Sequence, residues 1–326
     1  MITQITNFLL EQQNKDGSWG FFPGKAGAIE PTAYALMSLA SEDRAHIAID
    51  RGVDFLRKTQ TVRGAWAVST QDSDAATWAT ALAGLALLSF ESTESMCRPA
   101  ADFVLSSFGR HPRPWILRVA DWMRSFDASY VEENLRGWKW NPDTANWVEP
   151  TSYALLFLKK FLRSVANRPR AQTADGGTFK PVIAEAEALL YQRMCKEGGW
   201  NYGNARVLGE ELRPYPLTTA IALIALQNPS SPECQRSLGY LQRAVSDERS
   251  ALALCMAVHC FGLYGIHADH WMQAAAVLYD ETQFFQNIKT AALALLAEQS
   301  LSGENAFGLA SHQASAAIST QQAIAI

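Results

Sequence analysis

Internal repetition limits the fold of this chain more than any other sequence feature. Four segments share one pattern: a polar turn that contains Gly and Trp, a short loop, and a helix rich in Ala and Leu. These segments span residues 12–39, 59–88, 136–158 and 196–227. Two further helix pairs follow without the Trp turn, at about 232–263 and 267–300. Such repetition predicts an architecture built from helix pairs.

Apolar periodicity and helix stop signals predict about twelve helices in two alternating sets. The first set has charge on one face and is placed at 3–13, 43–59, 95–125 with a break near Pro112, 180–196, 232–244 and 267–280. The second set is placed at 30–40, 74–90, 149–163, 216–227, 248–263 and 283–300. Helices of the second set are apolar on nearly every side, so they must be buried all round. The sequence therefore predicts an all-α fold, a single (α/α)6 barrel with six inner and six outer helices.

The length of 326 residues would also allow two or three small domains. The barrel is expected to occupy residues 1–301. The tail at 302–326 has little periodic patterning and is expected to be loosely ordered.

Charge and composition exclude several classes of function. The 28 Lys and Arg against 32 Asp and Glu give a net charge of −4, without the basic stripe of a nucleic-acid binder. The chain has no apolar run long enough to span a membrane and no secretory signal at its start, so a cytoplasmic location is expected. Five scattered Cys are typical of reduced thiols. The pattern leaves the oligomeric state open.

The Trp turns carry a resemblance to a known superfamily. Residues 13–19 and 198–203, QNKDGSW and GGWNYG, resemble the QW-type repeats of terpene cyclases and prenyltransferases. Residues 64–68 and 72–77, GAWAV and DSDAAT, are similar to the GGWxF and DxDD(T) segment of class II terpene cyclases. In that family the middle Asp protonates an alkene or epoxide. The resemblance implies that Asp74 is the general acid and that Asp72 assists it, while Ala75 replaces the last Asp.

The same family has a D-x-x-x-H pattern, whose His hydrogen-bonds the catalytic Asp, on the next inner helix. Here Glu149 stands in place of the Asp and Tyr153 in place of the His. A Tyr hydroxyl can donate to a carboxylate but cannot carry positive charge as His does. Because the chain has room for one barrel only, it looks most like single-domain class II cyclases that close prenylated aromatic substrates into meroterpenoids. The implied partner is a small molecule with a polyprenyl chain, and no cofactor or metal is implied.

The residues themselves also favour acid-initiated chemistry. A carboxylic acid that is buried in an apolar barrel beside a second carboxylate stays protonated near neutral pH. Asp72 and Asp74 lie at a predicted helix start, where helix capping is the structural alternative. The cations that follow protonation are stabilised by aromatic faces. The expected substrate-binding residues at the heads of inner helices are Tyr34, Trp78, Trp147, Glu149, Tyr153, Tyr215 and Phe285.

Other aromatic residues have a structural explanation. Trp19, Trp66, Trp138 and Trp200 lie in the repeat turns, and we expect them to pack between outer helices. Residues 112–123 form an amphipathic segment in which Trp115 could line a substrate entrance or contact a membrane surface. Packing as an outer helix is the favoured interpretation of this segment. The Glu-Pro-Thr sequences at 30–32 and 149–151 suit helix N-termini without a further role.

Three alternative functions remain open. A protein prenyltransferase β-like subunit shares the barrel but needs an Asp/Cys/His zinc site, which the sequence lacks. His267, His270, Cys255, His259 and Cys260 lack the spacing of such a site, and packing is favoured for them. A non-catalytic barrel that binds isoprenoid lipids would fit the lost third Asp. A barrel-type glycosidase is less favoured because the carboxylates form no obvious exposed pair.

Overall fold

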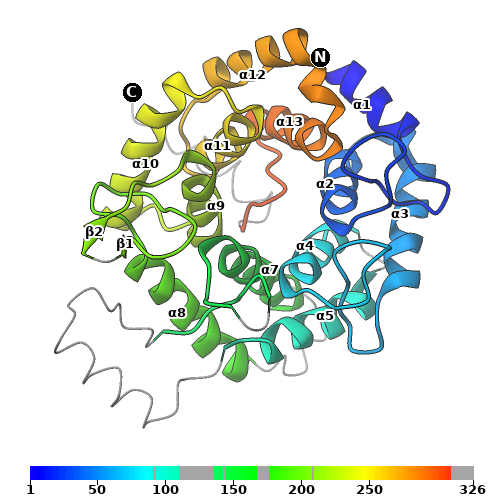
Figure 1. The fold of residues 1–326 in the computed structure, drawn as a ribbon. Coiled ribbons are helices and arrows are strands. Elements are labelled where there is room, and N and C mark those ends of the chain that lie inside the picture. The colour runs from blue at the N-terminus through cyan, green and yellow to red at the C-terminus, as the bar shows by residue number, and fades with distance from the viewer. Residues whose placement is uncertain (91–92, 110–134, 142–143, 167–175, 208, 310–326) are drawn as a thin grey trace, which may run out of the picture.

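A computed structural model describes residues 1–90, 93–109, 135–141, 144–166, 176–207 and 209–309. Within these ranges the chain is almost entirely helical, and six helices form a closed inner ring (Figure 1). The inner helices are α2 (Ile29–Leu39), α4 (Thr77–Leu87), α7 (Val148–Ala166), α9 (Pro216–Leu226), α11 (Ala251–Leu263) and α13 (Ile288–Leu301). Each packs against the next, and α13 closes the ring against α2.

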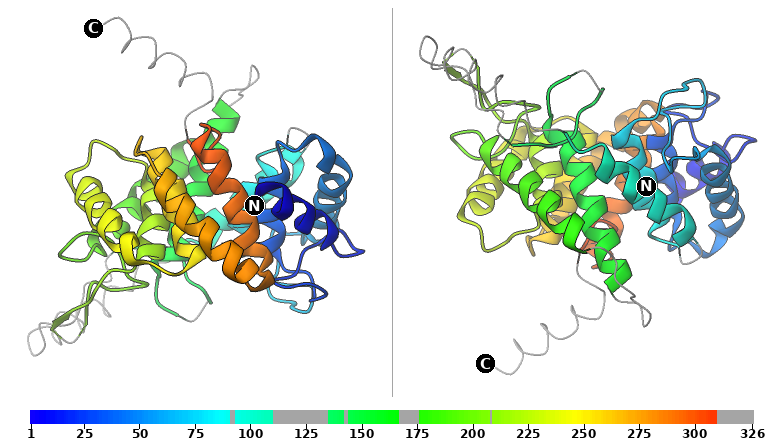
Figure 2. Two further views of the ribbon diagram at one scale, coloured as in Figure 1. Left: turned by 90° about the horizontal axis from the view of Figure 1, so that it is seen from above. Right: turned by 90° about the horizontal axis from the view of Figure 1, so that it is seen from below.

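The outer ring lies around the inner one and alternates with it along the chain. Its helices are α1 (Ile2–Glu11), α3 (His46–Thr59), α5 (Glu94–Ser106), α8 (Gly176–Gln192), α10 (Pro232–Ala244) and α12 (Asp269–Thr282). A short antiparallel hairpin, β1 (Arg206–Val207) and β2 (Glu210–Glu211), projects from one face of the toroid (Figure 2). Short 3₁₀ turns lie at 43–45, 245–247 and 283–286. The arrangement confirms the predicted (α/α)6 barrel. The segment from 110 to 125 of one predicted outer helix lies outside the described residues.

The inner ring is apolar because its helices are surrounded by protein. Every residue of α4 from Ala79 to Leu87 is buried. Gly84 of α4 lies against Phe157 of α7, and a Cβ at Gly84 would come within 2.4 Å of the Phe157 ring. The missing side chain therefore lets two neighbouring inner helices approach closely.

The four Trp turns make the same pair of hydrogen bonds in each repeat, and this pair is called the Trp latch below. Each indole N–H donates to a carbonyl near the end of the preceding outer helix: Trp19 to Leu9 at 2.7 Å, Trp66 to Leu56 at 2.8 Å, Trp138 to Val104 at 2.8 Å and Trp200 to Leu190 at 2.5 Å. Each Trp backbone N–H donates to a Thr hydroxyl of the following inner helix, namely Thr32, Thr80, Thr151 and Thr219. All four rings are buried. The structural role of these residues is confirmed, but each ties an outer helix to an inner one rather than packing between outer helices.

The start of the C-terminal tail is ordered, which differs from the expectation for 302–326. Phe307 is 3% exposed and contacts the rings of Tyr34 in α2 and His259 in α11 edge to face. Its carbonyl accepts a hydrogen bond from Gln227, and the Lys160 ammonium donates to Ala306. Figure 1 shows this segment in red inside the ring. Residues 302–309 therefore fill one end of the barrel, and 310–326 lie outside the described residues.

Truncating Phe307 should destabilise the protein because its ring fills space between inner helices. We expect Phe307→Ala to lower the free energy of unfolding by about 3 kcal/mol, at the lower end of the range for buried Phe. Phe285, which is 78% exposed, is the matched control, and Phe285→Ala should change stability by about 0.5 kcal/mol or less. Urea unfolding measures both. Equal, small effects would show that the tail does not pack into the barrel.

Candidate functional site

Three inner helices begin in the same way, and this brings three charged residues to one level of the barrel. The first backbone N–H of each helix donates to a loop of another repeat: Ile29 to Val68, Val148 to Tyr202 and Ile288 to Phe21. The residues that follow are Glu30, Glu149 and Lys289. The bond to Phe21 joins the last inner helix to the first repeat and so contributes to ring closure.

These charged residues contact neighbouring inner helices, and their charges act on one another inside the ring. The Lys289 ammonium lies 2.6 Å from a carboxylate oxygen of Glu30, and the two side chains are 18% and 12% exposed. The hydroxyl of Thr218 in α9 lies 3.4 Å from a carboxyl oxygen of Glu149. Since α2 and α7 are separated in the ring by α4, the electrostatic interaction of Glu30 with Glu149 runs through the lumen.

Two Tyr side chains lie one helical turn after the charged residues at the starts of α2 and α7. Tyr34 follows Glu30 on α2, and Tyr153 follows Glu149 on α7. Both rings are buried, and the Lys289 ammonium lies 6.0 Å from the centre of the Tyr34 ring. The Tyr34 hydroxyl is buried and lies close to Tyr153, so the two phenols approach each other inside the ring. Glu30, Tyr34, Glu149, Tyr153, Thr218 and Lys289 are called the lumen cluster below.

Burial makes Glu149 the candidate acid of the cluster. Burial raises the pKa of the Glu149 carboxyl above its ordinary value, and the charge of Glu30 acts in the same direction. Lys289 and the hydrogen bond from Thr218 oppose this shift. Burial also raises the pKa of both Tyr34 and Tyr153, so the phenols stay neutral. The cluster thus combines a proton donor with two neutral aromatic rings.

The raised pKa of Glu149 predicts a pH-dependent contribution to stability. The folded chain binds this proton more tightly than the unfolded chain, so the contribution is complete below the ordinary value of 4.5. It is lost as pH rises from 4.5 through the folded-state pKa. The Glu149→Gln side chain does not titrate. Its free energy of unfolding relative to that of the unmodified chain should therefore increase as pH rises from 4.5 through the folded-state pKa of Glu149. Urea unfolding at a series of pH values measures the difference, and a constant difference would contradict the shift.

Asp72 and Asp74, the predicted catalytic pair, are not buried. A backbone bridge between Ala67 and Ala75 folds the loop before α4 so that its tip turns outward. Asp72 accepts a hydrogen bond of 2.7 Å from the Ser69 hydroxyl, and both Asp side chains are exposed. Protonation of an alkene requires an acid kept from water. The expectation of a buried acid at Asp74 is therefore wrong, and among the described residues no hydrogen bond joins Asp74 to Tyr153.

The remaining predicted residues are distributed over several places. Trp78 packs edge to face on Trp140, with ring centres 5.2 Å apart. Trp147 and Tyr215 line a cavity of about 360 Å³ beside the start of α7. Phe285 is on the surface rather than at a buried helix head, because α13 begins only at Ile288 and leaves Phe285 in the preceding turn. Trp115 and its amphipathic segment lie outside the described residues.

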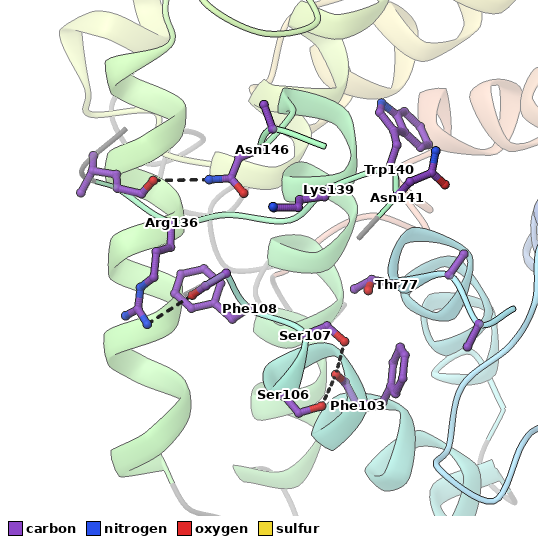
Figure 3. A pocket seen from close by; sticks show the side chains of 15 residues that line it. Thr77, Phe103, Ser106, Ser107, Phe108, Arg136, Lys139, Trp140, Asn141 and Asn146 are labelled. Atoms are coloured by element: carbon purple, nitrogen blue, oxygen red, sulfur yellow. Dashed lines mark hydrogen bonds between the residues drawn. The ribbon is translucent and has the colours of Figure 1, made fainter. Parts of the chain in front are cut away.

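A larger cavity of about 520 Å³ lies between α4, α5 and residues of 135–141 and 145–146 (Figure 3). Arg136 forms a two-pronged ion pair with Glu185 of α8, and its guanidinium lies 4.6 Å from the centre of the Phe108 ring. Lys139 and Asn141 add polar groups to the wall. The cavity shares residues 145 and 146 with the cavity at Trp147, so the two adjoin.

Sequence reasoning missed Lys289 and Thr218 and gave Glu30 only a helix-capping role. A signal was present for Lys289, since Ile288-Lys289 opens an inner helix as Ile29-Glu30 does. Among the described residues, no group of three or more His, Cys, Asp or Glu side chains is arranged to hold a metal ion. None of the helices in the described ranges is both long and apolar enough to cross a bilayer.

Comparison with known proteins gives one short sequence match and several solved structures of similar fold. No family model matches the chain. A 63-residue stretch is 36% identical to drimenyl diphosphate synthase from Streptantibioticus cattleyicolor, which is 19% of this chain and 12% of that protein. The match therefore spans only a small part of the relative.

Solved structures with low sequence identity share the whole architecture. A protein from Actinoplanes is 16% identical, with a TM-score of 0.58 over 92% of this chain and 98% of that one. A wild-type glycosidase is 9% identical, with a TM-score of 0.60 over 92% and 96% of the two chains. An α-amylase from Clostridium perfringens is 11% identical, with a TM-score of 0.57 over 91% and 96%. At these identities the likeness concerns the fold alone.

Proposed function

We propose that this chain is an enzyme of terpenoid chemistry that cyclises a polyprenyl chain by protonating a double bond, with Glu149 as the acid. The observation that carries the proposal is a largely buried carboxyl group, whose pKa burial raises, one helical turn from the buried and neutral phenol of Tyr153 and close to that of Tyr34. The short match to drimenyl diphosphate synthase supports the same class of chemistry. Glu149 takes the role that the motif resemblance gave to Asp74.

In the proposed first step, the O–H bond of Glu149 breaks and its proton forms a C–H bond with one alkene carbon. The π electrons of that double bond are used, and the other carbon becomes a cation. The next double bond attacks this cation and closes a ring. The last cation either loses a proton to a base or forms a C–O bond with a substrate hydroxyl, whose proton then passes to a base. The rings of Tyr34 and Tyr153 stabilise the passing charge, at about 0.5–2 kcal/mol each.

Electrostatics in the lumen cluster supports the return of Glu149 to its starting state. Once Glu149 has given up its proton, its carboxylate is stabilised by the nearby Lys289 charge and by the Thr218 hydroxyl. Burial and the Glu30 charge then favour uptake of a new proton. The substrate in this proposal is a polyprenyl chain attached to an aromatic head group. The proposed reaction uses no cofactor.

Incubation in deuterated water tests the proposal. The protein is mixed with farnesylated phenols of different ring substitution, and products are separated by gas chromatography and mass spectrometry. We expect cyclised product that carries one deuterium on the carbon protonated first. Cyclised product without deuterium would exclude protonation by an exchangeable acid. Substrate that is bound but recovered unaltered would favour the non-catalytic isoprenoid-binding barrel.

A second candidate function is glycoside hydrolysis, because the lumen cluster contains two carboxyl groups in different environments. Glu30 is paired with Lys289, whereas burial raises the pKa of Glu149, and such a pair suits an acid and a base. The glycosidases of similar fold are compatible with this function. Release of a chromophore from aryl glycosides, with no change in polyprenyl substrates, would favour it over cyclisation.

A further inference from the structure

The C-terminal tail enters the inner ring from the end opposite the proposed acid. Glu149 lies in the first turn of α7, and the inner helices begin at one level, whereas the tail follows Leu301 at the end of α13. Phe307 of the tail is buried and reaches Tyr34, with ring centres 6.4 Å apart. Residues 305–309, called the stopper below, therefore occupy the lumen on the side away from Glu149 (Figure 1).

Side chains of α7 and of the residue that ends α9 hold the main chain of the stopper. The side-chain amide of Gln227 donates to the Phe307 carbonyl at 2.9 Å, and its side-chain oxygen accepts from the Leu309 backbone N–H at 2.9 Å. The Lys160 ammonium of α7 donates to the Ala306 carbonyl. Buried main-chain groups need partners, and these side chains supply them where the stopper forms neither helix nor strand.

The backbone of Gln227 is left-handed, with a φ of 44°, at the C-terminal cap of α9. Glycine is the usual residue at such a cap, because a Cβ is unfavourable there. Gln283 ends α12 in the same conformation, with a φ of 49°, but its side chain donates to the Tyr279 carbonyl of its own helix. The side chain of Gln227 also donates to the Ile224 carbonyl of its own helix, and it adds the two bonds to the stopper. The hold on the stopper is therefore specific to position 227.

Phe307 connects the stopper to the lumen cluster through uncharged rings. It contacts Tyr34 on one side and His259 of α11 on the other, where the ring centres are 5.1 Å apart. Burial lowers the pKa of His259 to about 4, so this ring is neutral at neutral pH. Tyr34 lies close to Tyr153, which follows Glu149 by one helical turn. Packed, neutral rings offer water little to bind between the stopper and the acid.

We propose that the stopper keeps water out of the lumen, and that Phe307 is a positioning residue for Glu149 because it fixes Tyr34 beside Tyr153. The expected effect on the Glu149 carboxyl does not depend on what the chain catalyses. The consequence for a cyclisation rests on the proposed function.

Water that entered the lumen during cyclisation would divert the reaction. Its oxygen would form a C–O bond with the cationic carbon, one of its O–H bonds would break, and that proton would pass to a base. The product would then be an alcohol, heavier by one water than the alkene formed by loss of a proton. The stopper thus protects the cation as well as the acid.

Gln227→Gly releases the stopper without removing an apolar side chain from the core. Glycine suits left-handed backbone, so this variant should fold. Gln283→Gly is the matched control, since it makes the same change at a left-handed helix end that does not hold the stopper. Phe307→Ala removes the ring itself, and Phe307→Leu is the conservative variant that keeps most of the apolar volume.

Infrared titration of the Glu149 carboxylic acid band tests the proposal on the full chain, with each variant measured against its own Glu149→Gln form. We expect the midpoint to fall toward 4.5 in Gln227→Gly and Phe307→Ala, because entering water offsets the burial that raises the pKa of Glu149. Phe307→Leu should restore most of the midpoint, and Gln283→Gly should leave it unchanged.

Circular dichroism checks that the variants are folded. Glu30 and Lys289, the charged neighbours of Glu149, are kept in all of them, so a shift cannot come from a lost charge. An unchanged midpoint in folded Gln227→Gly and folded Phe307→Ala would overturn the proposal. An equal fall in Gln283→Gly would also overturn it, since that change does not release the stopper.

Product analysis separates this inference from the proposed function. With farnesylated phenols, we expect the alcohol formed by water capture to take a larger share of the cyclised product in Gln227→Gly than in Gln283→Gly. A shifted midpoint in a chain that forms no cyclised product would leave the stopper in place and remove the proposed function alone. An unshifted midpoint with normal cyclisation would remove the stopper's role and leave the proposed function.

Discussion

Replacing Glu149 by glutamine should slow turnover of a polyprenyl substrate by about 10³-fold, within the range contributed by a general acid. Glutamine keeps the size of the side chain and an oxygen that can accept from Thr218, but it has no acidic proton. Because the protonated carboxyl is the active form, the rate of the unmodified enzyme should fall as pH rises through the raised pKa of Glu149. Initial rates at several pH values, with product measured by mass spectrometry, give both effects.

Asp74→Asn is the matched control for this experiment. Asp74 carries the motif resemblance, yet it is exposed on the loop before α4. We expect this variant to keep a rate within about twofold of the unmodified enzyme, since surface changes away from the site have small effects. Loss of activity in Asp74→Asn together with an active Glu149→Gln would return the acid to the position implied by the motif.

The Trp latches should make large contributions to stability. Trp200 is fully buried, and its indole N–H and backbone N–H are both satisfied by neighbouring helices. We expect Trp200→Ala to lower the free energy of unfolding by about 3–5 kcal/mol, because it removes a large ring and leaves a cavity. Guanidinium unfolding followed by circular dichroism measures the loss.

Trp200→Phe separates ring packing from hydrogen bonding at the same position. It keeps an aromatic ring but removes one of two donors to the Leu190 carbonyl, which still accepts from the Arg193 backbone N–H, and this should cost about 0.5–1.5 kcal/mol. A loss below about 1 kcal/mol in Trp200→Ala would show that the latch is not a structural tie. Similar losses in both variants would mean that the hydrogen bond, rather than the ring, dominates.

The fold could be predicted from sequence because burial dictates the pattern of each helix. The stretch from Thr218 to Leu226 in α9 is apolar apart from two Thr, and it is buried throughout. The predicted range of 232–244 for α10 agrees with Pro232–Ala244, where Ser231 caps the helix and Pro232 occupies its first turn. Helix starts were less accurate. Residues 74–76 and 283–287 were assigned to inner helices but belong to the preceding turns.

The candidate site was harder to predict because it depends on contacts between distant residues. The spacing of Asp72 and Asp74 does not reveal that the Ala67–Ala75 bridge turns the loop tip outward. The pairing of Glu30 with Lys289 joins the first and last helices of the inner ring, α2 and α13, which lie 259 positions apart in the sequence (289 − 30). Tyr34, Glu149 and Tyr153 were named from sequence, but their meeting in the lumen follows only from ring closure. Phe307 was missed since its weakly patterned segment gave no helix signal.

Infrared titration of the carboxylic acid band tests the assignment of Glu149 most directly. Difference spectra between the unmodified chain and Glu149→Gln isolate the band of this one group, and a pH series gives its midpoint. We predict a midpoint above the ordinary value of 4.5, with the same band retained in Asp74→Asn. A midpoint at or below 4.5, or a band that disappears in Asp74→Asn instead, would contradict the account.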